Sequence, residues 1–414
     1  MCVLNVRAAP IGNCCGCLSS SWLKGACGHG FYLNPNNEPF ANIVANDIYV
    51  DKSGLIAYMN DRIGKARPLV ASSRPRRFGK TLAAQMLVAY YSKGCDSRTV
   101  FENLEIAQSE SFKKHLNKYD VISLDIQEMR STYLQIKDKK GKSVLDFIQS
   151  EVLNELREAF PTCVKDSCEV LAQALAKINN VMGNQFIIII DEWDCFFRED
   201  KDNNALIDAY IIFLRSLFKG KQSDGFVKLA YITGILPIKK YGTQSALNNF
   251  REKTMVAPDG IDPYIGFTED EVKTLCEQNM ASFAKMQRWY DGYVFDQTDD
   301  LAEDNSFAED DEFACDDAIE LVNVQETEFD QKASNVIMHV YSPNSVMEAL
   351  SNRKFQNYWS QTETYESLKI YITMDYDGLK QKIVDMLGGS KCKIDVESFQ
   401  NDMTTFDSWD DVLR

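Results

Sequence analysis

Residues 68–81 read Pro-Leu-Val-Ala-Ser-Ser-Arg-Pro-Arg-Arg-Phe-Gly-Lys-Thr. The stretch opens with a short apolar run and continues into a turn-rich loop that carries three arginines and a proline. Beyond the loop, apolar side chains recur at helical spacing at Leu82, Met86, Leu87, Ala89 and Tyr90. We therefore predict a strand, a loop of the size that a phosphate group needs, and a helix.

The end of this loop has the chemistry of a phosphate site. Such a site needs inward-pointing backbone amides, a lysine that meets the β- and γ-phosphates, and a hydroxyl for magnesium. Gly79, Lys80 and Thr81 supply these groups, together with the amide of Phe78. The full G-x-x-x-x-G-K-[ST] pattern is not met, because Arg74 stands where the first glycine belongs. By itself, Gly-Lys-Thr is equally compatible with a helix N-terminus that carries a surface lysine.

A second segment, 186–192, reads Phe-Ile-Ile-Ile-Ile-Asp-Glu. Four isoleucines between polar flanks indicate a central parallel strand that is buried on both faces. Asp191 and Glu192 then lie at the carboxyl edge of the sheet, where ligands of α/β proteins bind. There, Asp191 would hold magnesium through water and Glu192 would polarise the attacking water. The alternative is a strand that ends in a solvated acidic turn.

Other segments extend this alternation of strands and helices. We predict strands at 121–125 and 227–234 and helices at about 144–160, 167–179 and 204–219. The alternation indicates an α/β fold with a mainly parallel sheet. Together with the Gly-Lys-Thr loop and the Asp191-Glu192 pair, it is interpreted as a P-loop NTPase core. Thr233 lies at the end of the strand 227–234. In ATPases with an extra inserted strand, a polar residue at this position senses the γ-phosphate, but Thr233 is also compatible with a threonine that merely ends a strand.

The predicted organisation has three parts. Residues 1–44 read as a poorly ordered leader, 45–260 as the core, and 261–414 as a helical, lid-like extension. Thr268 followed by Glu271 is a capping box, so a helix should begin at about 269. Residues 296–330 are dense in Asp and Glu and read as a solvated acidic insertion.

The leader contains closely spaced cysteines. Cys14-x-x-Cys17 has the spacing of zinc ligands, and Cys27 with His29 would complete a set of four. The spacing of the second pair differs from that of the common zinc fingers, so a loose tail is the preferred interpretation.

The overall composition constrains the compartment and the partners. Twelve cysteines without paired spacing are typical of a reducing compartment, and no apolar run reaches the length of a membrane span. We therefore expect a soluble, intracellular protein of the cytoplasm, without a membrane partner. The formal charge of −16 argues against broad attraction to nucleic acid, although it does not exclude a local basic groove.

Several segments together resemble the AAA-ATPase-like domain family, which is often joined to a C-terminal PD-(D/E)XK nuclease-like domain. The resemblance covers about residues 45–360 and includes Arg74 in place of the first glycine. It rests on these segments: YVDKS at 49–53, RPRRFGKT at 74–81, DEWD at 191–194, ITGI at 232–235, SALNNF at 245–250, GFTEDEV at 266–272, WYDGY at 289–293 and YSPNSV at 341–346. Departures include Trp193 and Leu236-Pro237.

The resemblance implies a site for ATP and Mg²⁺ in which Lys80, Thr81, Asp191 and Glu192 have the usual P-loop roles. The expected function is a Mg-dependent ATPase that acts as a conformational switch. The alternatives are a nucleotide-gated module with little turnover, which signals to a protein partner or effector domain, and the ATPase portion of a nuclease. We expect no nuclease activity from this chain, because its sequence ends before the family's nuclease segment.

Three further segments remain open. Arg74, Arg76 and Arg77 would contact phosphate or organise the loop rather than bind nucleic acid, since three arginines make no basic footprint. The aromatic cluster WYDGY at 289–293 is expected to pack in a core. Glu199-Asp200-Lys201 has the E-x-K shape of a nuclease motif, but a solvated loop is the preferred interpretation.

Overall fold

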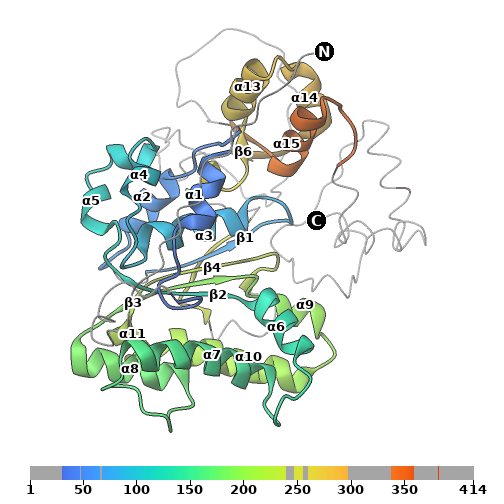
Figure 1. The fold of residues 1–414 in the computed structure, drawn as a ribbon. Helices are drawn as coiled ribbons and strands as arrows, with labels where there is room; N and C mark the ends of the chain where they lie inside the picture. Colours follow the sequence, from blue (N-terminus) through green and yellow to red (C-terminus); the bar gives the residue numbers. More distant parts are fainter. Residues whose placement is uncertain are drawn as a thin grey trace, which may run out of the picture.

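The computed structural model describes residues 30–46, 48–65, 68–238, 247–254, 260–296, 337–358 and 381. Its central element is a five-stranded sheet in which every neighbouring pair is parallel, in the order β2-β3-β4-β1-β5 (Figure 1). The strands are β1 (Leu69–Ser73), β2 (Asp120–Asp125), β3 (Phe186–Asp191), β4 (Val227–Gly234) and β5 (Arg251–Lys253). The predicted α/β fold with a parallel sheet is therefore confirmed. The Gly-Lys-Thr loop follows β1 and the Asp191-Glu192 pair lies at the end of β3. Because β4 lies between these two strands, the loop and the acidic pair are separated by one strand.

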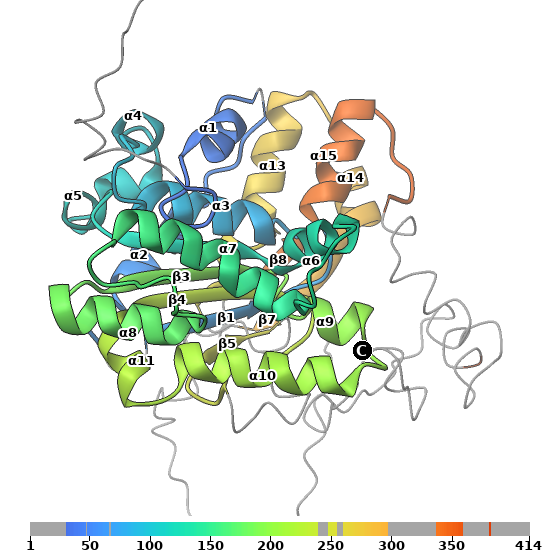
Figure 2. The same ribbon diagram turned by 60° about the horizontal axis from the view of Figure 1, so that its bottom comes forward.

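Helices cover both faces of this sheet. In Figure 1, one group lies above the sheet and the other below it, and the rotated view in Figure 2 shows α7, α8 and α10 running across the lower face. The upper group contains α1 (Glu38–Val44), α2 (Gly54–Asn60), α3 (Lys80–Tyr91), α4 (Arg98–Phe101), η1 (Glu105–Gln108) and α5 (Phe112–His115). The others are α6 (Ile126–Gln135), α7 (Val144–Ala159), α8 (Leu171–Met182), α9 (Cys195–Glu199), α10 (Asn204–Phe218) and α11 (Lys221–Phe226).

The isoleucines of β3 show why this strand is apolar throughout. Ile187 and Ile189 pack into the hydrophobic core beneath α1–α5, whereas Ile188 and Ile190 pack into the core against α6–α8 and α10. Successive side chains of a strand point to opposite faces. A strand covered on both faces therefore needs apolar side chains at consecutive positions, as the sequence indicated.

The predicted leader is too long. Residues 30–44 belong to the folded core, because Leu33 forms a bridge with Ile122 on β2 and Phe40 of α1 is buried against Phe101. The carboxylate of Glu155 accepts the backbone amides of residues 31–33 and fixes this segment to α7. These partners lie far along the chain, so local patterning did not reveal them. The cysteine and histidine candidates at 14, 15, 17, 27 and 29 lie outside the described residues.

The segment after residue 260 is not purely helical. It includes a three-stranded sheet of order β6-β8-β7, with both pairs antiparallel. The predicted helical extension is wrong in this respect, because β7 pairs with a strand more than 40 residues later, with the acidic segment between them. Its elements are η3 (Asp262–Tyr264), β6 (Phe267–Thr268), α13 (Glu269–Gln278), α14 (Phe283–Tyr290), β7 (Asp291–Asp296), β8 (Ile337–Tyr341) and α15 (Pro343–Asn352).

Two local predictions in this segment can be compared with the structure. The capping box is present: Thr268 accepts the amide of Glu271 and Glu271 accepts the amide of Thr268, so α13 begins at Glu269. The aromatic cluster is divided, since Tyr290 is buried whereas Trp289 is 49% exposed. Apart from Asp296, the predicted acidic insertion lies outside the described residues. No described helix has the length and apolar character needed to cross a membrane.

Candidate nucleotide site

The loop between β1 and α3 is shaped by two residues with left-handed backbone angles. Gly79, the N-cap of α3, has φ +85°, and Arg77 has φ +66°. Glycine adopts this conformation without steric cost, so it suits the position immediately before the helix. The amides of the first turn of α3 have no intrahelical partners and are available to an anion. The structure therefore has the strand, loop and helix that the sequence predicts.

Lys80 lies at the start of α3 and is only 5% exposed. Its Nζ donates a hydrogen bond to the carbonyl oxygen of Pro75 at 3.0 Å, which holds the loop closed around the side chain. Burial lowers the pKa of Lys80, while the negative charges of Glu192, Asp191 and Asp194 oppose that shift. The lysine thus lies within electrostatic reach of the acidic residues that the sequence places after β3.

Asp191 ends β3 directly opposite Asp125, which ends β2. Burial raises the pKa of Asp191 to about 6; a hydrogen bond from Thr81 opposes the rise, and Asp125 and Glu192 add to it. Oδ1 of Asp191 accepts the amide of Glu192 at 2.9 Å, whereas the buried Oδ2 has no hydrogen-bond partner among the described residues. This unpartnered oxygen is buried close to the Thr81 hydroxyl, and Asp191 is not among the residues that line the cavity in front of α3.

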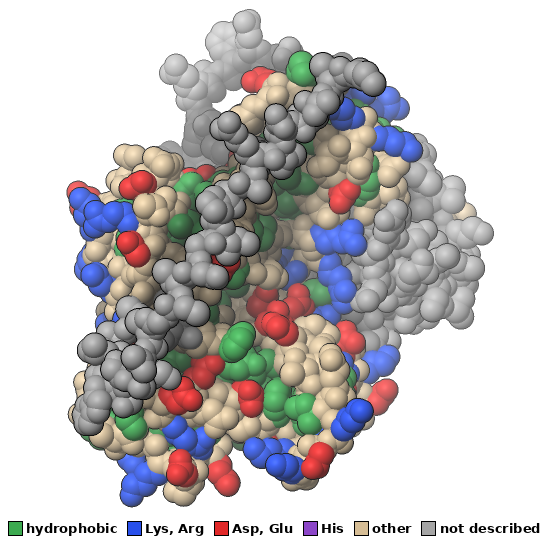
Figure 3. Space-filling model, in the orientation of Figure 1, with side chains coloured by type: hydrophobic (Ala, Val, Ile, Leu, Met, Phe, Trp, Pro, Cys, Tyr) green, Lys and Arg blue, Asp and Glu red, His purple; other side chains and the backbone are tan. Residues whose placement is uncertain are grey.

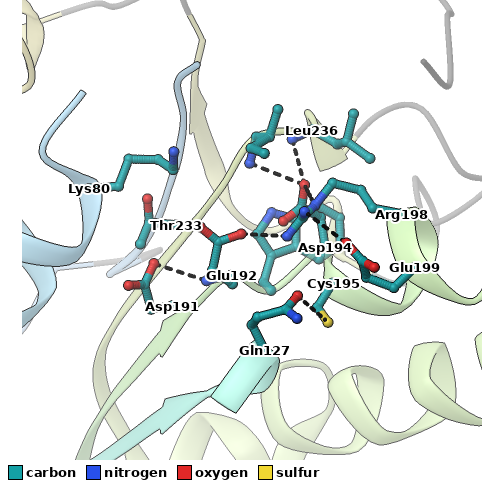
Figure 4. A network of polar contacts seen from close by, with 12 residues as sticks. Lys80, Gln127, Asp191, Glu192, Asp194, Cys195, Arg198, Glu199, Thr233 and Leu236 are labelled. Carbon is teal, nitrogen blue, oxygen red and sulfur yellow. Dashed lines mark hydrogen bonds and ion pairs between the residues drawn. The ribbon is translucent and has the colours of Figure 1, made fainter. Parts of the chain in front are cut away.

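Glu192 follows in a left-handed conformation, with φ +50°. Its carboxylate accepts a short hydrogen bond from the Arg198 guanidinium, and Nε of Arg198 also donates to Asp194 at 3.2 Å. Figure 4 shows Glu192 between Asp191 on one side and Arg198 on the other, with Lys80 facing the acidic pair. The predicted lysine and acidic pair are thus brought together.

Two predicted site residues have side chains that are used elsewhere. Arg74 is 1% exposed, and its Nη1 donates to the carbonyl oxygens of Ser73 and Lys253 at 3.0 and 2.9 Å. Thr233 is fully buried, and its hydroxyl donates to the carbonyl oxygen of Ser72 at 3.2 Å. Both side chains join neighbouring strands beneath the loop. Neither side chain lines the cavity in front of the loop.

A cavity of about 1120 Å³ opens in front of the loop. In Figure 3, the face is hollowed between the helices above the sheet and those below it, and acidic side chains gather at the lower edge of the hollow. The polar part of the wall contains Arg76, Arg77, Lys80, Thr81, Asp125, Gln127, Glu128, Glu192, Arg198 and Glu199. The apolar part contains Phe40, Ile43, Ile48, Tyr49, Val50, Leu82 and Met86, and Phe267, Asn344 and Met347 close the cavity from the C-terminal unit. A volume of this size accommodates a nucleotide.

Several residues in this wall or buried behind it are not indicated by local sequence patterns. Asp125 was assigned only to a buried strand, although carboxyl ends of neighbouring parallel strands share one edge of a sheet, and that rule would have identified it. Arg198 and Asp194 gave no such signal, because their pairing depends on the turn after β3. The residues of the E-x-K run separate: Glu199 lines the cavity, whereas Asp200 forms an ion pair with Arg130 at 2.6 Å.

The donor set around Asp191 fits a hard cation. The unpartnered Oδ2 and the neighbouring Thr81 hydroxyl are oxygen ligands of the kind that Mg²⁺ prefers, and Mg²⁺ usually takes its remaining ligands from water and phosphate. Among the described residues, no group of three or more His, Cys, Asp and Glu could enclose a metal ion.

The chain is similar to known proteins. Residues 38–243 match the sequence profile of the family described as Predicted AAA-ATPase. A curated relative, the "Uncharacterized protein in vnfD 5'region" of Azotobacter chroococcum mcd 1, is 21% identical over 261 residues, which are 62% of this chain and 47% of that protein. The chain thus spans about half the length of this relative.

Among solved structures, the ORC2 protein of Aeropyrum pernix in its ADPNP-ADP complexes is similar at 12% identity and a TM-score of 0.25, over 57% of this chain and 54% of that one. The family match begins at α1 and extends beyond β4, so it contains the loop, both acidic strand ends and the strand between them. On that match, the chain belongs to the Predicted AAA-ATPase family and contains a P-loop ATPase domain.

Proposed function

We propose that this domain binds ATP with Mg²⁺ and hydrolyses it in the cavity in front of α3. The observation that carries the proposal is the convergence of Lys80 and Thr81 with Asp191 and Glu192, from two strands that are not neighbours. The phosphates would lie on the amides at residues 78–81, and the Lys80 ammonium would offset their charge. The apolar wall between α1 and α3 would receive the base.

Thr81 and Asp191 are the residues that would hold magnesium. Bound there, the ion would supply charge neutralisation between the β- and γ-phosphates. Asp191 must be ionised to hold it, and the pKa of about 6 makes that state dominant at neutral pH. Thr233 enters the proposal as the residue that joins β4 to β1 beneath the phosphates, because its hydroxyl is bound to Ser72.

Glu192 is proposed to orient the attacking water. Its backbone N–H donates a hydrogen bond to Oδ1 of Asp191, and its carboxylate accepts one from Arg198, so the group is held in place at the cavity wall. Phosphoryl transfer depends mainly on positioning and charge neutralisation. A carboxylate held in one place therefore suits this step.

The same contact also supports the alternative function. A carboxylate that is held by an arginine is less free to turn toward a water molecule. The domain would then bind ATP and signal its presence with little turnover. Because Phe267, Asn344 and Met347 line the cavity, a bound nucleotide would also contact the unit after residue 260 and bias its placement. This is the proposed route to a conformational switch and to a protein partner.

The decisive experiment measures ATP binding and phosphate release by the full chain. Lys80→Ala should abolish binding at millimolar Mg-ATP. Glu192→Gln should keep binding while turnover falls by about 100-fold or more if the domain hydrolyses ATP. Under the alternative, the wild type binds ATP without appreciable phosphate release, and Glu192→Gln changes little.

Lys221→Ala is the matched control. Lys221 is likewise the first residue of a helix and follows a glycine with positive φ, but it lies outside the cavity. Its substitution should leave both binding and turnover unchanged. Equal losses from Lys80→Ala and Lys221→Ala would refute the assignment of this loop.

A further inference from the structure

The side chain of Arg198 joins the proposed base to a buried acid. Arg198 is 11% exposed; it reaches Glu192 through Nη2 and Asp194 through Nε, while Nη1 lies 3.6 Å from Glu199. Three carboxylates therefore surround one guanidinium (Figure 4). The surrounding carboxylates offset the positive charge of Arg198 and occupy several of its N–H donors, so it is poorly suited to bind a phosphate. Its contacts suit a fixed link between side chains.

Asp194 holds this link in place. Its side chain is completely buried, and Oδ2 accepts the backbone amides of Ile235 and Leu236 at 3.1 and 2.8 Å. These amides follow the last residue of β4, so Asp194 joins the turn after β3 to the end of the neighbouring strand. Burial raises the pKa of Asp194 and the positive charge of Arg198 opposes the rise.

Gly234 makes this approach feasible. A Cβ at position 234 would lie 2.6 Å from Oδ1 of Asp194 and 2.7 Å from Cδ1 of Trp193, which is closer than such atoms approach. The amide of Trp193 also donates to the carbonyl oxygen of Thr233 at 3.1 Å. The turn that follows β3 is therefore packed directly against β4 and has little freedom to shift.

From these contacts we infer that Arg198 is a positioning residue for Glu192, fixed in turn by Asp194 and the amides that follow β4. The inference rests on the proposed ATPase function and deepens it. Arg198 acts on water only through the Glu192 carboxylate. Its loss should therefore slow turnover without weakening ATP binding.

The test compares single-turnover rates and ATP affinities of the full chain with Arg198→Gln, Arg198→Lys and Glu192→Gln. We expect Arg198→Gln to lower the rate by about 10- to 100-fold, with the dissociation constant for ATP within about twofold of wild type. Arg198→Lys should recover part of the rate, because one ammonium can still meet Glu192 but cannot span both acids.

A double-mutant cycle separates positioning from a direct contact with phosphate. In the Glu192→Gln background, Arg198→Gln should change the rate by less than about twofold, since its effect passes through the missing carboxylate. A full additional loss in that background, or a weakened ATP affinity in the single variant, would overturn the inference. So would a single variant with the wild-type rate.

If Arg198→Gln fails to fold because the buried acid loses its partner, the pair Asp194→Asn with Arg198→Gln removes both charges together and keeps an acceptor for the amides after β4. This pair should show the same loss of rate, and a wild-type rate would count against the inference.

The wild-type chain separates failure of the inference from failure of the proposed function. If the wild type releases no phosphate, both the proposed hydrolysis and this inference are refuted. If the wild type hydrolyses ATP normally and the Arg198 variants do so at the same rate, only the inference is refuted.

Discussion

At the scale of single residues, the buried carboxylate of Asp191 is expected to lower the stability of the fold while it supports the binding of Mg-ATP. Its pKa is raised from 3.8 to about 6 in the folded chain. Between these two values the folded state binds the proton more strongly than the unfolded state does, so stability falls as pH rises from about 4 to 6 and stays lower above that window. The upward shift corresponds to a penalty on the order of 3 kcal/mol at neutral pH.

Asp191→Asn should therefore stabilise the nucleotide-free chain at pH 8 by about 1–3 kcal/mol and have almost no effect below pH 4. The same substitution should abolish the stabilisation that Mg-ATP gives. Denaturant titrations at both pH values, with and without Mg-ATP, measure these effects. An equal change in stability at both pH values would contradict the raised pKa.

Arg74 and Arg77 offer a contrast within one loop. Arg74 is buried and joins β1 to β5 through the carbonyl of Lys253, whereas Arg77 is exposed and lines the cavity. Burial lowers the pKa of Arg74 to about 10. We expect Arg74→Ala to cost about 2–4 kcal/mol of stability, through a cavity and unpaired carbonyls, and to leave the ATP affinity of the folded chain unchanged.

Arg77→Ala should show the opposite result, with unchanged stability and weaker ATP binding. Thermal melts and ATP titrations on both variants make the comparison. A loss of affinity with intact stability in Arg74→Ala would return that residue to the phosphate site, as the sequence alone suggested.

At the scale of elements, two helix caps offer a matched pair of glycines. Gly79 is the N-cap of α3, with φ +85°, and Gly183 is the C-cap of α8, with φ +73°. An added Cβ would meet no atom within 4 Å at either position. Alanine at either position has only the strain of the left-handed backbone, which costs about 1–2 kcal/mol. Both Gly79→Ala and Gly183→Ala should therefore lower stability by a similar amount.

Only Gly79→Ala should weaken ATP binding, because only that glycine sets the direction of the amides before α3. Melting curves and nucleotide titrations on the two variants separate the effects. If Gly183→Ala lowered ATP affinity as much, the loop would have no special role.

At the scale of the whole molecule, Lys52 attaches the unit after residue 260 to the core. Its Nζ donates to both carboxylate oxygens of Glu271 and to the carbonyl oxygen of Pro263 at 2.6 Å, and the two side chains are 15% and 25% exposed. Burial lowers the pKa of Lys52, and Glu271 opposes that shift. Because Glu271 also caps α13, one ion pair links helix initiation to the contact between units.

Lys52→Met should lower stability by about 1–3 kcal/mol, after allowance for partial exposure, and should increase proteolytic cleavage after residue 260. Limited proteolysis followed by mass spectrometry locates the cleavage. The control is Lys273→Met, which removes an exposed ion pair on the same helix and should leave the cleavage pattern unchanged. Equal protection in Lys52→Met and wild type would show that this link does not secure the unit.

The fold could be predicted wherever a pattern is local. The isoleucines of β3 indicate a strand covered on both faces, and the glycine before Lys80 followed by apolar residues at helical spacing indicates a helix. Both can be predicted because residues close together in the sequence determine these local structures. The same holds for the capping box of α13. These local patterns were enough to predict the α/β class and a nucleotide site that contains Lys80, Thr81, Asp191 and Glu192.

What only the tertiary structure decided are contacts between segments that lie far apart in sequence. The side chain of Arg74 donates to β5, residues 30–44 pack on the core, and β7 pairs with β8. The link from Glu192 through Arg198 to the end of β4 also exists only after folding. Such contacts depend on which buried charges and carbonyls must be paired once the chain is compact, and no window of sequence contains both partners.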